Sequence, residues 1–310
     1  MLKKILGGCF LQKTNRFFDT VASLIIPCKN EGPNVKMTVD SILAVQPEFK
    51  TEVIVVDDGS IDGCCRFLQE DSRYAGINFI SSPGLGAAQA RNFGASAAHG
   101  EYLIFCDAHI TVPEGWLESL LDAFNNPGVD AVSPAIGSLE NPAAVGYGQS
   151  WNKNLEVFWL PPPPDAGIRA VPLLPGGCIA LRAEAFHRVG GFDKGFIVWG
   201  HEDVELSLKL WLFGYRLYVT PPVKILHLFR KKHPYRVTMD HVQYNLLRMA
   251  FSHFKNERVE KVFNLIKVYG QQDKIMKKIL KGGALLQRQD YFARRKHDDD
   301  WFMNRFKIDF

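Results

Sequence analysis

The sequence predicts an α/β fold with a mainly parallel central sheet, and three observations support this prediction. Short, uninterrupted apolar runs alternate with segments of helical spacing through the first half of the chain. Continuous apolar strands are typical of parallel sheets that helices cover on both faces. Three of these runs end abruptly in polar clusters, and ligands bind such sheets at the carboxyl ends of strands. The clusters are residues 27–30, 57–58 and 107–109.

In the first half, strands and helices are expected to alternate. The apolar runs are bounded by Pro, Asp and Gly residues, which stop strands. The helical segments carry apolar residues three and four positions apart or are rich in Ala. Gly100 is expected to stop the second helix. The predicted strands are 22–28, 51–57, 76–82 and 101–109, and the predicted helices are 34–45 and 87–98.

The second half is predicted to be less regular. Residues 159–177 contain four consecutive prolines, which cannot join a helix or a strand ladder, and a loop of this length in a compact enzyme is usually functional or disordered. From Asp240 onward the pattern is helical and basic, which predicts a helical extension at 240–310. The remaining elements are a strand within 128–137, a strand, helix and Gly-Gly turn within 176–193, an amphipathic helix within 202–215 and two short strands within 216–230.

The overall composition fits one large domain or two closely packed halves. The 310 residues include 37 Lys and Arg against 33 Asp and Glu, and this near balance argues against a nucleic-acid partner. The basic excess lies late in the chain. A basic stripe can attract phosphates or an anionic membrane surface, although a solvated helix face is the commoner cause. Peripheral membrane contact therefore stays open.

The six cysteines predict buried thiols in a reducing compartment rather than a disulfide framework. None forms a C-x-x-C pair, and several lie in apolar runs. The first twelve residues, MLKKILGGCFLQ, are too poor in apolar residues for a secretory signal, and no apolar run is long enough for a membrane span. We therefore expect a cytoplasmic protein that can associate with a membrane surface, with residues 1–20 as an N-terminal tail.

The stretch YLIFCDAH ends by presenting Asp107 and His109, one residue apart. Side chains at positions i and i+2 of a strand point to the same face, so these two can converge on one cation. Taken alone, the pair also fits a turn-forming Asp beside a solvated His. A turn alone does not require three polar clusters at one sheet edge, and their coincidence there favours a ligand site.

These residues belong to a wider resemblance. SLIIPCKNE, EVIVVDDGS, GLGAAQARNFGA and GEYLIFCDAH resemble successive motifs of family 2 glycosyltransferases. The segment FIVWGHEDVELSLKLWLFGYRLYVTPPVKILHLFRKKHPY is similar to polypeptide N-acetylgalactosaminyltransferases, with their Trp-Gly-x-Glu turn, His-x-Phe-Arg strand and Pro-Tyr loop. The resemblance implies a GT-A fold, the Rossmann-like architecture of nucleotide-diphospho-sugar transferases, over 21–239. The nucleotide-binding half would be 21–135, and the acceptor and catalytic half 136–239.

The resemblance also implies a divalent metal. Such families hold a metal on the diphosphate of a UDP-sugar donor with an Asp-x-Asp or Asp-x-His motif, which here is Asp107 to His109. The polypeptide transferases add the His of the His-x-Phe-Arg strand, here His227, for which a satisfied core histidine is the alternative. A cation can hold the diphosphate charge and stabilise its departure. One carboxylate with two imidazoles is less typical of Mg²⁺, so Mn²⁺ is the first choice.

A set of donor-binding residues follows from the same resemblance. Asp58 is expected to accept a hydrogen bond from uracil, while Asp57 serves the turn. The base would be lined by Pro27, Lys29 and Glu31, and Arg91 would place a cation near the donor. Gly176 and Gly177 would let the backbone approach the donor, and Trp199 would border the sugar. A mobile loop that carries Arg230, His233 and Tyr235 would close over the diphosphate. An ordinary turn, surface or core position is the alternative for each. The set is Pro27, Lys29, Glu31, Asp58, Arg91, Gly176, Gly177, Trp199, Arg230, His233 and Tyr235.

The pair Glu202-Asp203 departs from the retaining polypeptide transferases, which commonly have Glu-Asn there. A Glu-Asp pair is the family 2 hallmark, in which the carboxylate serves as the base of an inverting reaction, although both acids can also merely cap the helix. We therefore predict a metal-dependent hexosyl- or N-acetylhexosaminyltransferase that uses a UDP-sugar with inversion, with Asp203 as general base. A retaining N-acetylgalactosaminyltransferase-like enzyme and a non-catalytic nucleotide-sugar-binding protein are the alternatives. The acceptor stays open among polysaccharide, lipid, peptide and small molecule.

Overall fold

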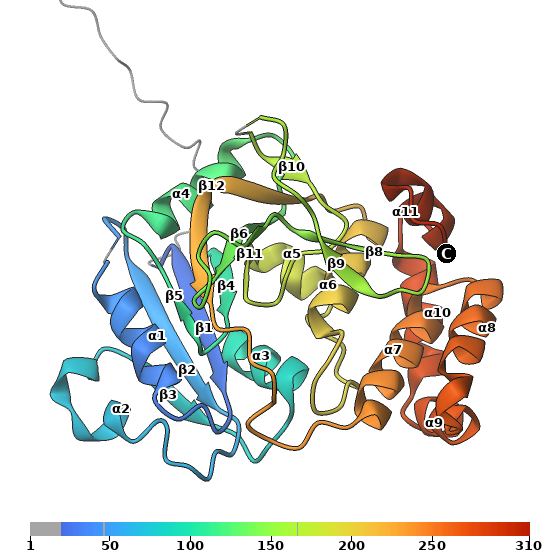
Figure 1. Ribbon diagram of the computed structural model, residues 1–310, viewed down its shortest axis with the longest axis horizontal. Helices are drawn as coiled ribbons and strands as arrows, with labels where there is room; N and C mark the ends of the chain where they lie inside the picture. Colours follow the sequence, from blue (N-terminus) through green and yellow to red (C-terminus); the bar gives the residue numbers. More distant parts are fainter. Residues whose placement is uncertain (1–19, 46, 166) are drawn as a thin grey trace, which may run out of the picture.

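The protein is described here by a computed structural model that covers residues 20–310 apart from positions 46 and 166. The predicted tail at 1–20 therefore lies outside the described residues except for Thr20, and so does Cys9. A ten-stranded mixed sheet runs through the described part of the chain, with helices on both of its faces (Figure 1). Its main path is β10-β12-β6-β11-β4-β1-β2-β3, with β5 beside β12 and β7 beside β6.

The first half forms the parallel part of the sheet, as predicted. β1 pairs in parallel with β2 and β4, and β2 pairs in parallel with β3. Successive side chains of β1 alternate between two cores: Leu24 lies in the core that includes α1, and Ile25 in the core that includes α3. The bounds are β1 (Ala22–Cys28), α1 (Asn34–Leu43), β2 (Thr51–Asp57), α2 (Phe67–Glu70), η1 (Ser72–Tyr74), β3 (Asn78–Ser81), α3 (Ala87–Ser96), β4 (Tyr102–Cys106), β5 (Ile110–Thr111), α4 (Trp116–Asp122) and η2 (Ala123–Asn125).

The second half interrupts the parallel order. β11 lies antiparallel between β4 and β6. The two short strands expected within 216–230 are one strand, β12, with an irregularity between Thr220 and Lys224. Pro221 and Pro222 lie at this irregularity, where their missing N–H groups break the ladder without ending the strand. The elements are β6 (Ala131–Ser138), β7 (Val145–Gly146), β8 (Gln149–Trp151), β9 (Val157–Trp159), β10 (Arg169–Ala170), β11 (Cys178–Arg182), α5 (Ala183–Arg188), α6 (Glu202–Leu212) and β12 (Leu217–His227).

The segment predicted to be irregular contains two short pieces of strand. β9 pairs with β8 in a separate two-stranded sheet and ends at Trp159, and β10 pairs with β12. The four prolines between them, residues 161–164, have no regular structure. The hairpin of β8 and β9 forms because backbone groups on both sides of a turn can pair locally, which a pattern of apolar residues does not reveal.

The C-terminal extension is helical, as predicted, and its helices gather on one side of the molecule (Figure 1). Its side chains share a hydrophobic core with α6: Leu247 and Phe302 pack in the same cluster as Trp211. The core is thus continuous across the domain boundary predicted at residue 240. No helix among residues 20–310, leaving out 46 and 166, is long and apolar enough to cross a bilayer. The helices are α7 (Met239–His253), α8 (Asn256–Leu265), η3 (Ile266–Tyr269), α9 (Gln272–Lys281), α10 (Ala284–Arg294) and α11 (Asp299–Phe306).

Candidate functional site

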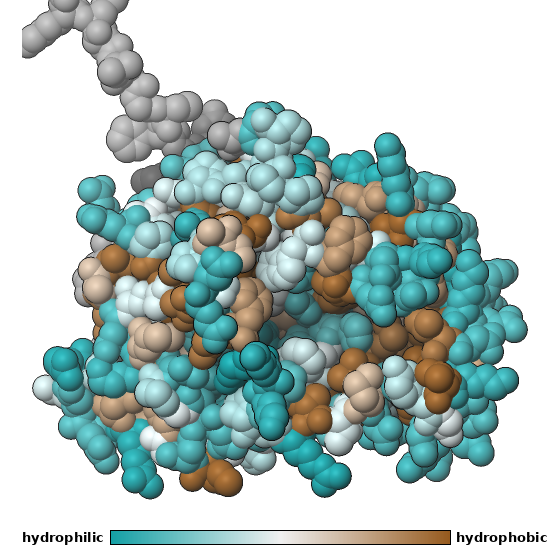
Figure 2. All heavy atoms as spheres, viewed as in Figure 1, coloured by the Kyte–Doolittle hydropathy of each residue, from teal (hydrophilic) through white to brown (hydrophobic). Residues whose placement is uncertain are grey.

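Two adjoining cavities lie at the carboxyl ends of the parallel strands. Their volumes are about 330 Å³ and about 700 Å³. Because five residues line both, the cavities form one cleft, and Figure 2 shows a hollow near the centre of the corresponding face. Every residue predicted to bind the metal or the donor, or to act in catalysis, lines one cavity or the other. The shared residues are Arg91, Asp107, Trp199, His227 and Phe229.

Asp107, His109 and His227 converge at the junction of the cavities. One ligand atom from each lies within 4.8 Å of the others. His227 Nε2 is 3.2 Å and His109 Nε2 is 3.9 Å from Asp107 Oδ2. β4 ends at Cys106, so Asp107 and His109 meet through the turn between β4 and β5, not through strand alternation as expected. The pairing of β5 with β12 then brings His227 opposite Ile110.

This group has the chemistry to hold a divalent cation. It offers one carboxylate and two imidazoles, and the Nδ1 atom of His227 is buried without a hydrogen-bond partner in the described part of the chain. A histidine placed only for core packing would have partners for both of its buried nitrogens. In His227, Nε2 faces the Asp107 carboxylate, and the described part of the chain provides no partner for Nδ1. Burial alone would raise the pKa of Asp107, but the hydrogen bond to His227 and the charge of Arg91 hold it well below its usual range. Asp107 is therefore an ionised carboxylate.

Arg91 joins this group to the pair at the start of α6. Its guanidinium lies 2.7 Å from Asp107 Oδ1 and 3.4 Å from Glu202 Oε1. The Arg91 side chain is 7% exposed, so the surface alternative does not describe it. Burial opposes its charge, yet the two carboxylates raise its pKa above the ordinary value. Arg91, on α3, thus neutralises acids in both cavities.

Glu31 and Arg230 hold His109 from the other side. Arg230 donates to both oxygens of Glu31, at 2.7 and 3.0 Å. Glu31 Oε2 also lies 3.4 Å from His109 Nδ1. Burial favours the neutral form of Glu31, but His109 and Arg230 lower its pKa overall. A carboxylate on the remote nitrogen of a metal-ligating histidine fixes the ring orientation and raises the basicity of the ligand.

Asp58 organises the loop that enters α3. Its carboxylate accepts hydrogen bonds from Ser82 Oγ (2.6 Å), from the Leu85 N–H (2.6 Å) and from the Gly86 N–H (2.9 Å). Asp57 accepts from the Ser60 N–H, which is the turn role expected of it. Asp58 is nearly buried but lines the smaller cavity, so it can offer remaining lone pairs to a ligand there.

The segment from Arg230 to Tyr235 forms part of the wall of the smaller cavity. The Trp199 and His233 rings lie 4.3 Å apart, and the Lys29 ammonium lies 6.0 Å from the Tyr235 ring. Burial raises the pKa of Tyr235, which keeps its hydroxyl protonated as a donor. Segments from β1, the turn before α6 and the segment after β12 therefore enclose one space, together with Pro27 beside Lys29.

Glu202 and Asp203 open α6 at the edge of the larger cavity. Glu202 Oε2 accepts from the Gly200 N–H at 2.8 Å. Asp203 accepts from the Val204 N–H at 2.9 Å and from the Gly176 N–H at 2.8 Å. Burial raises the pKa of Glu202 to about 7, because Arg91 offsets it only in part, and burial also raises the pKa of Asp203 above its ordinary value. Glu202 can therefore exchange a proton near neutral pH, and the Asp203 carboxylate is more basic than that of an ordinary aspartate.

The two predicted glycines let backbone approach this chemistry closely. A Cβ added to Gly176 would lie 3.0 Å from Asp203 Oδ2, and one added to Gly177 would lie 3.0 Å from His227 Cδ2. Larger residues would push both side chains aside. The glycines thus touch the predicted base and metal ligand in the larger cavity, in addition to any contact with a donor.

Several lining residues were not predicted from the sequence. Val198 has a positive φ of 52° and accepts a hydrogen bond from the Ala87 N–H, which ties the turn before α6 to α3. His201 also has a positive φ, and burial lowers its pKa to about 4. No local pattern marks such positions, because each depends on segments distant in sequence. The others include Cys28, Gly84, Gly86, Ala90, Gln149, Trp159, Phe229, Met239, Val242 and Tyr269.

Comparison with known families agrees with this geometry. The model of glycosyl transferase family 2 matches residues 23–190, more than half of the chain. The chain belongs to glycosyl transferase family 2. A second model, described as the N-terminal domain of galactosyltransferase, matches residues 170–234. Together, the two matches cover both halves of the cleft in this family 2 chain and confirm the predicted family.

Curated relatives of this family 2 chain include N-acetylgalactosaminyltransferases. Polypeptide N-acetylgalactosaminyltransferase 5 of Caenorhabditis elegans is 31% identical over 292 residues, which is 83% of this chain and 46% of the relative. A putative polypeptide N-acetylgalactosaminyltransferase 13 of Drosophila melanogaster is 32% identical over 69% of this chain and 42% of its own length. The chain thus spans less than half the length of these relatives.

Two solved structures share the architecture. GalNAc-T7, crystallised with UDP, GalNAc and Mn²⁺, has a TM-score of 0.73 at 21% identity over 93% of this chain and 56% of that protein. The mannosyltransferase PcManGT from Pyrobaculum calidifontis, in complex with GDP-Man and Mn²⁺, has a TM-score of 0.54 at 19% identity over 93% of this chain and 83% of its own. The predicted GT-A fold is confirmed.

Proposed function

We propose that this family 2 chain is a metal-dependent glycosyltransferase that transfers a sugar from a UDP-sugar donor. One observation carries the proposal: the Asp107, His109 and His227 group opens directly onto the Glu202-Asp203 pair. A transferase needs a cation site for the diphosphate and a carboxylate near the acceptor, and here they share one cleft. GalNAc-T7 was crystallised with UDP, GalNAc and Mn²⁺, which supports this donor class and metal, and PcManGT in complex with GDP-Man and Mn²⁺ supports the metal.

The donor would occupy the smaller cavity. Asp107, His109 and His227 would hold the cation, whose chemistry when bound is Lewis-acid stabilisation of the departing diphosphate. Asp58 and Lys29 line the same cavity, where Lys29 Nζ donates to the Asp58 carbonyl at 2.8 Å, and they would meet the nucleoside. Arg230 and Tyr235 line the side of this cavity, where they would exclude water from the diphosphate. The residues thus divide between the base end and the phosphate end.

Asp203 would act as the general base of an inverting transfer. It lies in the first turn of α6, where the helix dipole stabilises negative charge, and two backbone N–H groups fix its carboxylate. Its pKa is raised by burial, which brings a carboxylate closer to the range suited to accepting the proton of an acceptor hydroxyl. The Glu202 carboxylate is held by Arg91 and Gly200, so it positions Arg91 rather than taking the proton.

A second candidate is a retaining transfer of N-acetylgalactosamine to a polypeptide. The names of the curated relatives favour it. The two candidates differ in the configuration of the product. Inversion gives a β-linked product from an α-linked donor, and Asp203→Asn would abolish turnover. A retained α-linkage, or near-normal turnover of Asp203→Asn, would instead support the second candidate.

The larger cavity would receive the acceptor. The extension contributes Met239, Val242, Leu246 and Tyr269 to its lining, and Trp159 of β9 lines it as well. These side chains are apolar or aromatic, so the acceptor would present an apolar portion beside the reacting hydroxyl. The extension thereby shapes the acceptor side, in agreement with its packing against α6.

The test is a panel of nucleotide sugars with Mn²⁺, in which UDP or GDP release is followed with and without candidate acceptors. We expect release only from UDP-sugars, only with a divalent cation, and none from Asp107→Asn. Glu118→Gln, which removes a carboxylate of α4 outside the cleft, is the matched control and should behave as wild type. Metal-independent turnover, or turnover with GDP-sugars alone, would contradict the proposal.

A further inference from the structure

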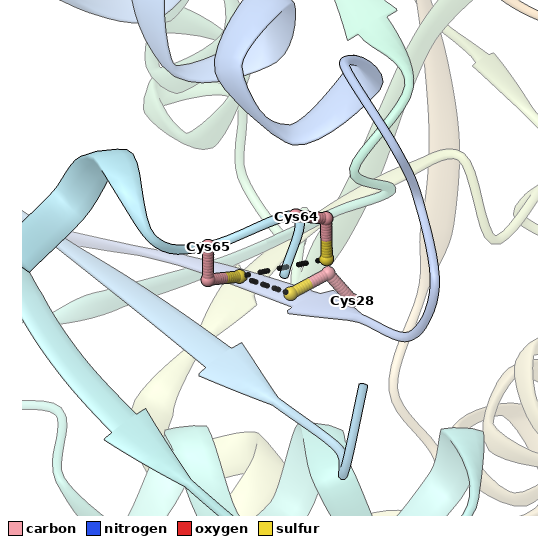
Figure 3. Close-up of side chains that lie close together, drawn as sticks. All are labelled: Cys28, Cys64 and Cys65. Carbon is pink, nitrogen blue, oxygen red and sulfur yellow. Dashed lines mark hydrogen bonds between the residues drawn. The ribbon is translucent and has the colours of Figure 1, made fainter. Parts of the chain in front are cut away.

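Three buried cysteines form a cluster that the donor and acceptor sites do not use. Cys28 ends β1, and Cys64 and Cys65 lie in the segment between β2 and α2. Their side chains point toward one another (Figure 3). The Cys28 and Cys65 sulfurs are 3.2 Å apart, the Cys64 and Cys65 sulfurs are 3.8 Å apart, and all three lie within 4.8 Å of one another.

We propose that Cys28, Cys64 and Cys65 form a three-thiolate binding site for a soft metal ion such as Zn²⁺. Thiolates select Zn²⁺ and Cu⁺ over harder cations. Two sulfurs bound to one tetrahedral Zn²⁺ at about 2.3 Å lie roughly 3.8 Å apart. The Cys64 to Cys65 distance already matches, and Cys28 must move away from Cys65 by roughly half an ångström to match as well. Three protein ligands leave a fourth position for water or another small ligand.

Hydrogen bonds hold the two segments that carry the cysteines against each other. The Asn30 N–H donates to Ser60 Oγ at 2.9 Å, and the Ile61 N–H donates to Asn30 Oδ1 at 2.8 Å. Asp62 accepts from the N–H groups of Gly32 and Cys64. Such fixed segments deliver ligands at a set spacing, which is what a preformed metal site requires.

The surroundings of the sulfurs also suit thiolates. The Cys64 thiol donates to Ser60 Oγ at 3.4 Å, and a Cys64 thiolate would accept from the same hydroxyl instead. Cys28 is also among the residues that line the smaller cavity, so the cluster adjoins the cleft. The Cys106 and Cys178 thiols differ, because they face each other as a pair across the β4 and β11 ladder, and no third cysteine joins them among residues 20–310 apart from 46 and 166. That pair has the arrangement of core packing, whereas the cluster of three has the arrangement of a ligand set.

The cluster lies directly beneath residues of the cleft. Cys28 is flanked by Pro27 and Lys29, and its carbonyl oxygen accepts a hydrogen bond from the Asp58 N–H at 2.9 Å. An ion on the three sulfurs would therefore stiffen the ends of β1 and β2 where they enter the smaller cavity. This consequence rests on the proposed donor site, whereas the metal site itself does not.

The test is a Cd²⁺ titration of the reduced full-length chain, followed by the thiolate-to-metal charge-transfer absorption in the ultraviolet. All proteins carry Cys9→Ser, which removes the thiol outside the described residues. We expect saturation near one equivalent, and at least a tenfold loss of affinity in Cys28→Ala, Cys64→Ala and Cys65→Ala. The Asp107, His109 and His227 group has no sulfur and gives no such absorption, so failure of the proposed function would leave the result unaffected.

Cys178→Ala is the matched control, because it also removes a buried thiol, and it should bind Cd²⁺ as the parent does. The midpoint of thermal unfolding with and without Zn²⁺ supplies a second readout: Zn²⁺ should raise it more for the parent than for Cys65→Ala, because the Asp107, His109 and His227 group can bind Zn²⁺ in both proteins. No charge-transfer absorption at one equivalent, or absorption that survives in the Cys28→Ala/Cys65→Ala double variant, would overturn the proposal. A free-thiol count in the parent that is two below its number of cysteines would also overturn the proposal, because two of the cysteines would then form a disulfide instead of a metal site.

Discussion

Arg91 is the side chain through which the two parts of the cleft are coupled. It contacts a carboxylate of the cation group and a carboxylate of the α6 pair while almost wholly buried. Removal of one partner from such a buried set leaves a charge uncompensated. The free energy lost in this way is larger than the net stabilisation that the intact set provides. Each acid in the cleft therefore has a protonation state that depends on its neighbours, and single substitutions report on these couplings.

His227 is predicted to act on metal activation and not on folding. In His227→Ala, the Mn²⁺ concentration that gives half-maximal turnover should rise at least tenfold, since even outer-shell partners change metal affinity by about ten- to hundredfold. Thermal unfolding without metal should stay close to wild type. His99→Ala, which removes a histidine that is 76% exposed, is the control. An unchanged metal dependence would assign His227 to packing.

Glu202 is predicted to make stability depend on pH. Burial raises its pKa in the folded chain from an ordinary 4.5 to about 7. Between about pH 4.5 and pH 7, the folded state therefore binds more protons than the unfolded state. The stabilisation that protonated Glu202 gives the fold is full below about pH 4.5 and is lost as pH rises through about 7. By metal-free urea unfolding, the stability of Glu202→Gln relative to wild type should increase between pH 5 and pH 8, by up to about 3 kcal/mol.

The exposed residue Glu114, changed to Gln, controls for the removal of any carboxylate. A stability difference between Glu202→Gln and wild type that stays constant between pH 5 and pH 8 would show that Glu202 is not the titrating group.

At the scale of elements, α7 connects the cleft to the rest of the extension. Its residues Met239 and Val242 line the larger cavity, while Arg248 on the same helix pairs with the buried Asp193 at 3.0 Å. Arg248 also donates to the Gly282 carbonyl and to Gln287, so it links three segments. The close approach needs Gly195, whose added Cβ would overlap the guanidinium.

Arg248→Ala is therefore predicted to destabilise the fold. It leaves the Asp193 carboxylate, which is fully buried, without its cation, so we expect a loss of about 3–5 kcal/mol in urea unfolding. Lys36→Ala breaks a solvent-exposed pair with Asp40 and should cost no more than about 1 kcal/mol. Similar losses in the two variants would contradict the role given to the buried pair.

Elements with a strong period were predictable from sequence, and their pairing was less so. β1, β2 and β4 are continuous apolar runs, and their polar ends met at one edge because parallel strands place equivalent ends together. The antiparallel direction of β11 was not predictable, since a five-residue apolar run reads the same in both directions. The continuity of β12 was missed because Pro221-Pro222 resembles a strand end.

For the molecule as a whole, family motifs in the sequence predicted which residues lie in the cleft. The hydrogen bonds and ion pairs that connect these residues could be seen only in the tertiary structure. The contact of Glu31 with Arg230 joins positions 199 residues apart in the chain. The cysteine cluster has the same origin, since Cys28 meets Cys65 only when the segment before α2 folds over the end of β1. Spacing in a sequence carries no signal for such meetings.

A divalent cation held by Asp107, His109 and His227 should mediate the binding of a uridine nucleotide in the cleft. The decisive measurement is a calorimetric titration of UDP into the full-length chain, with Mn²⁺ and with chelator. Wild type should bind UDP at least tenfold more tightly with Mn²⁺, and Asp107→Asn should show no such difference. Equal UDP affinity in wild type with and without Mn²⁺ would rule out the cation bridge.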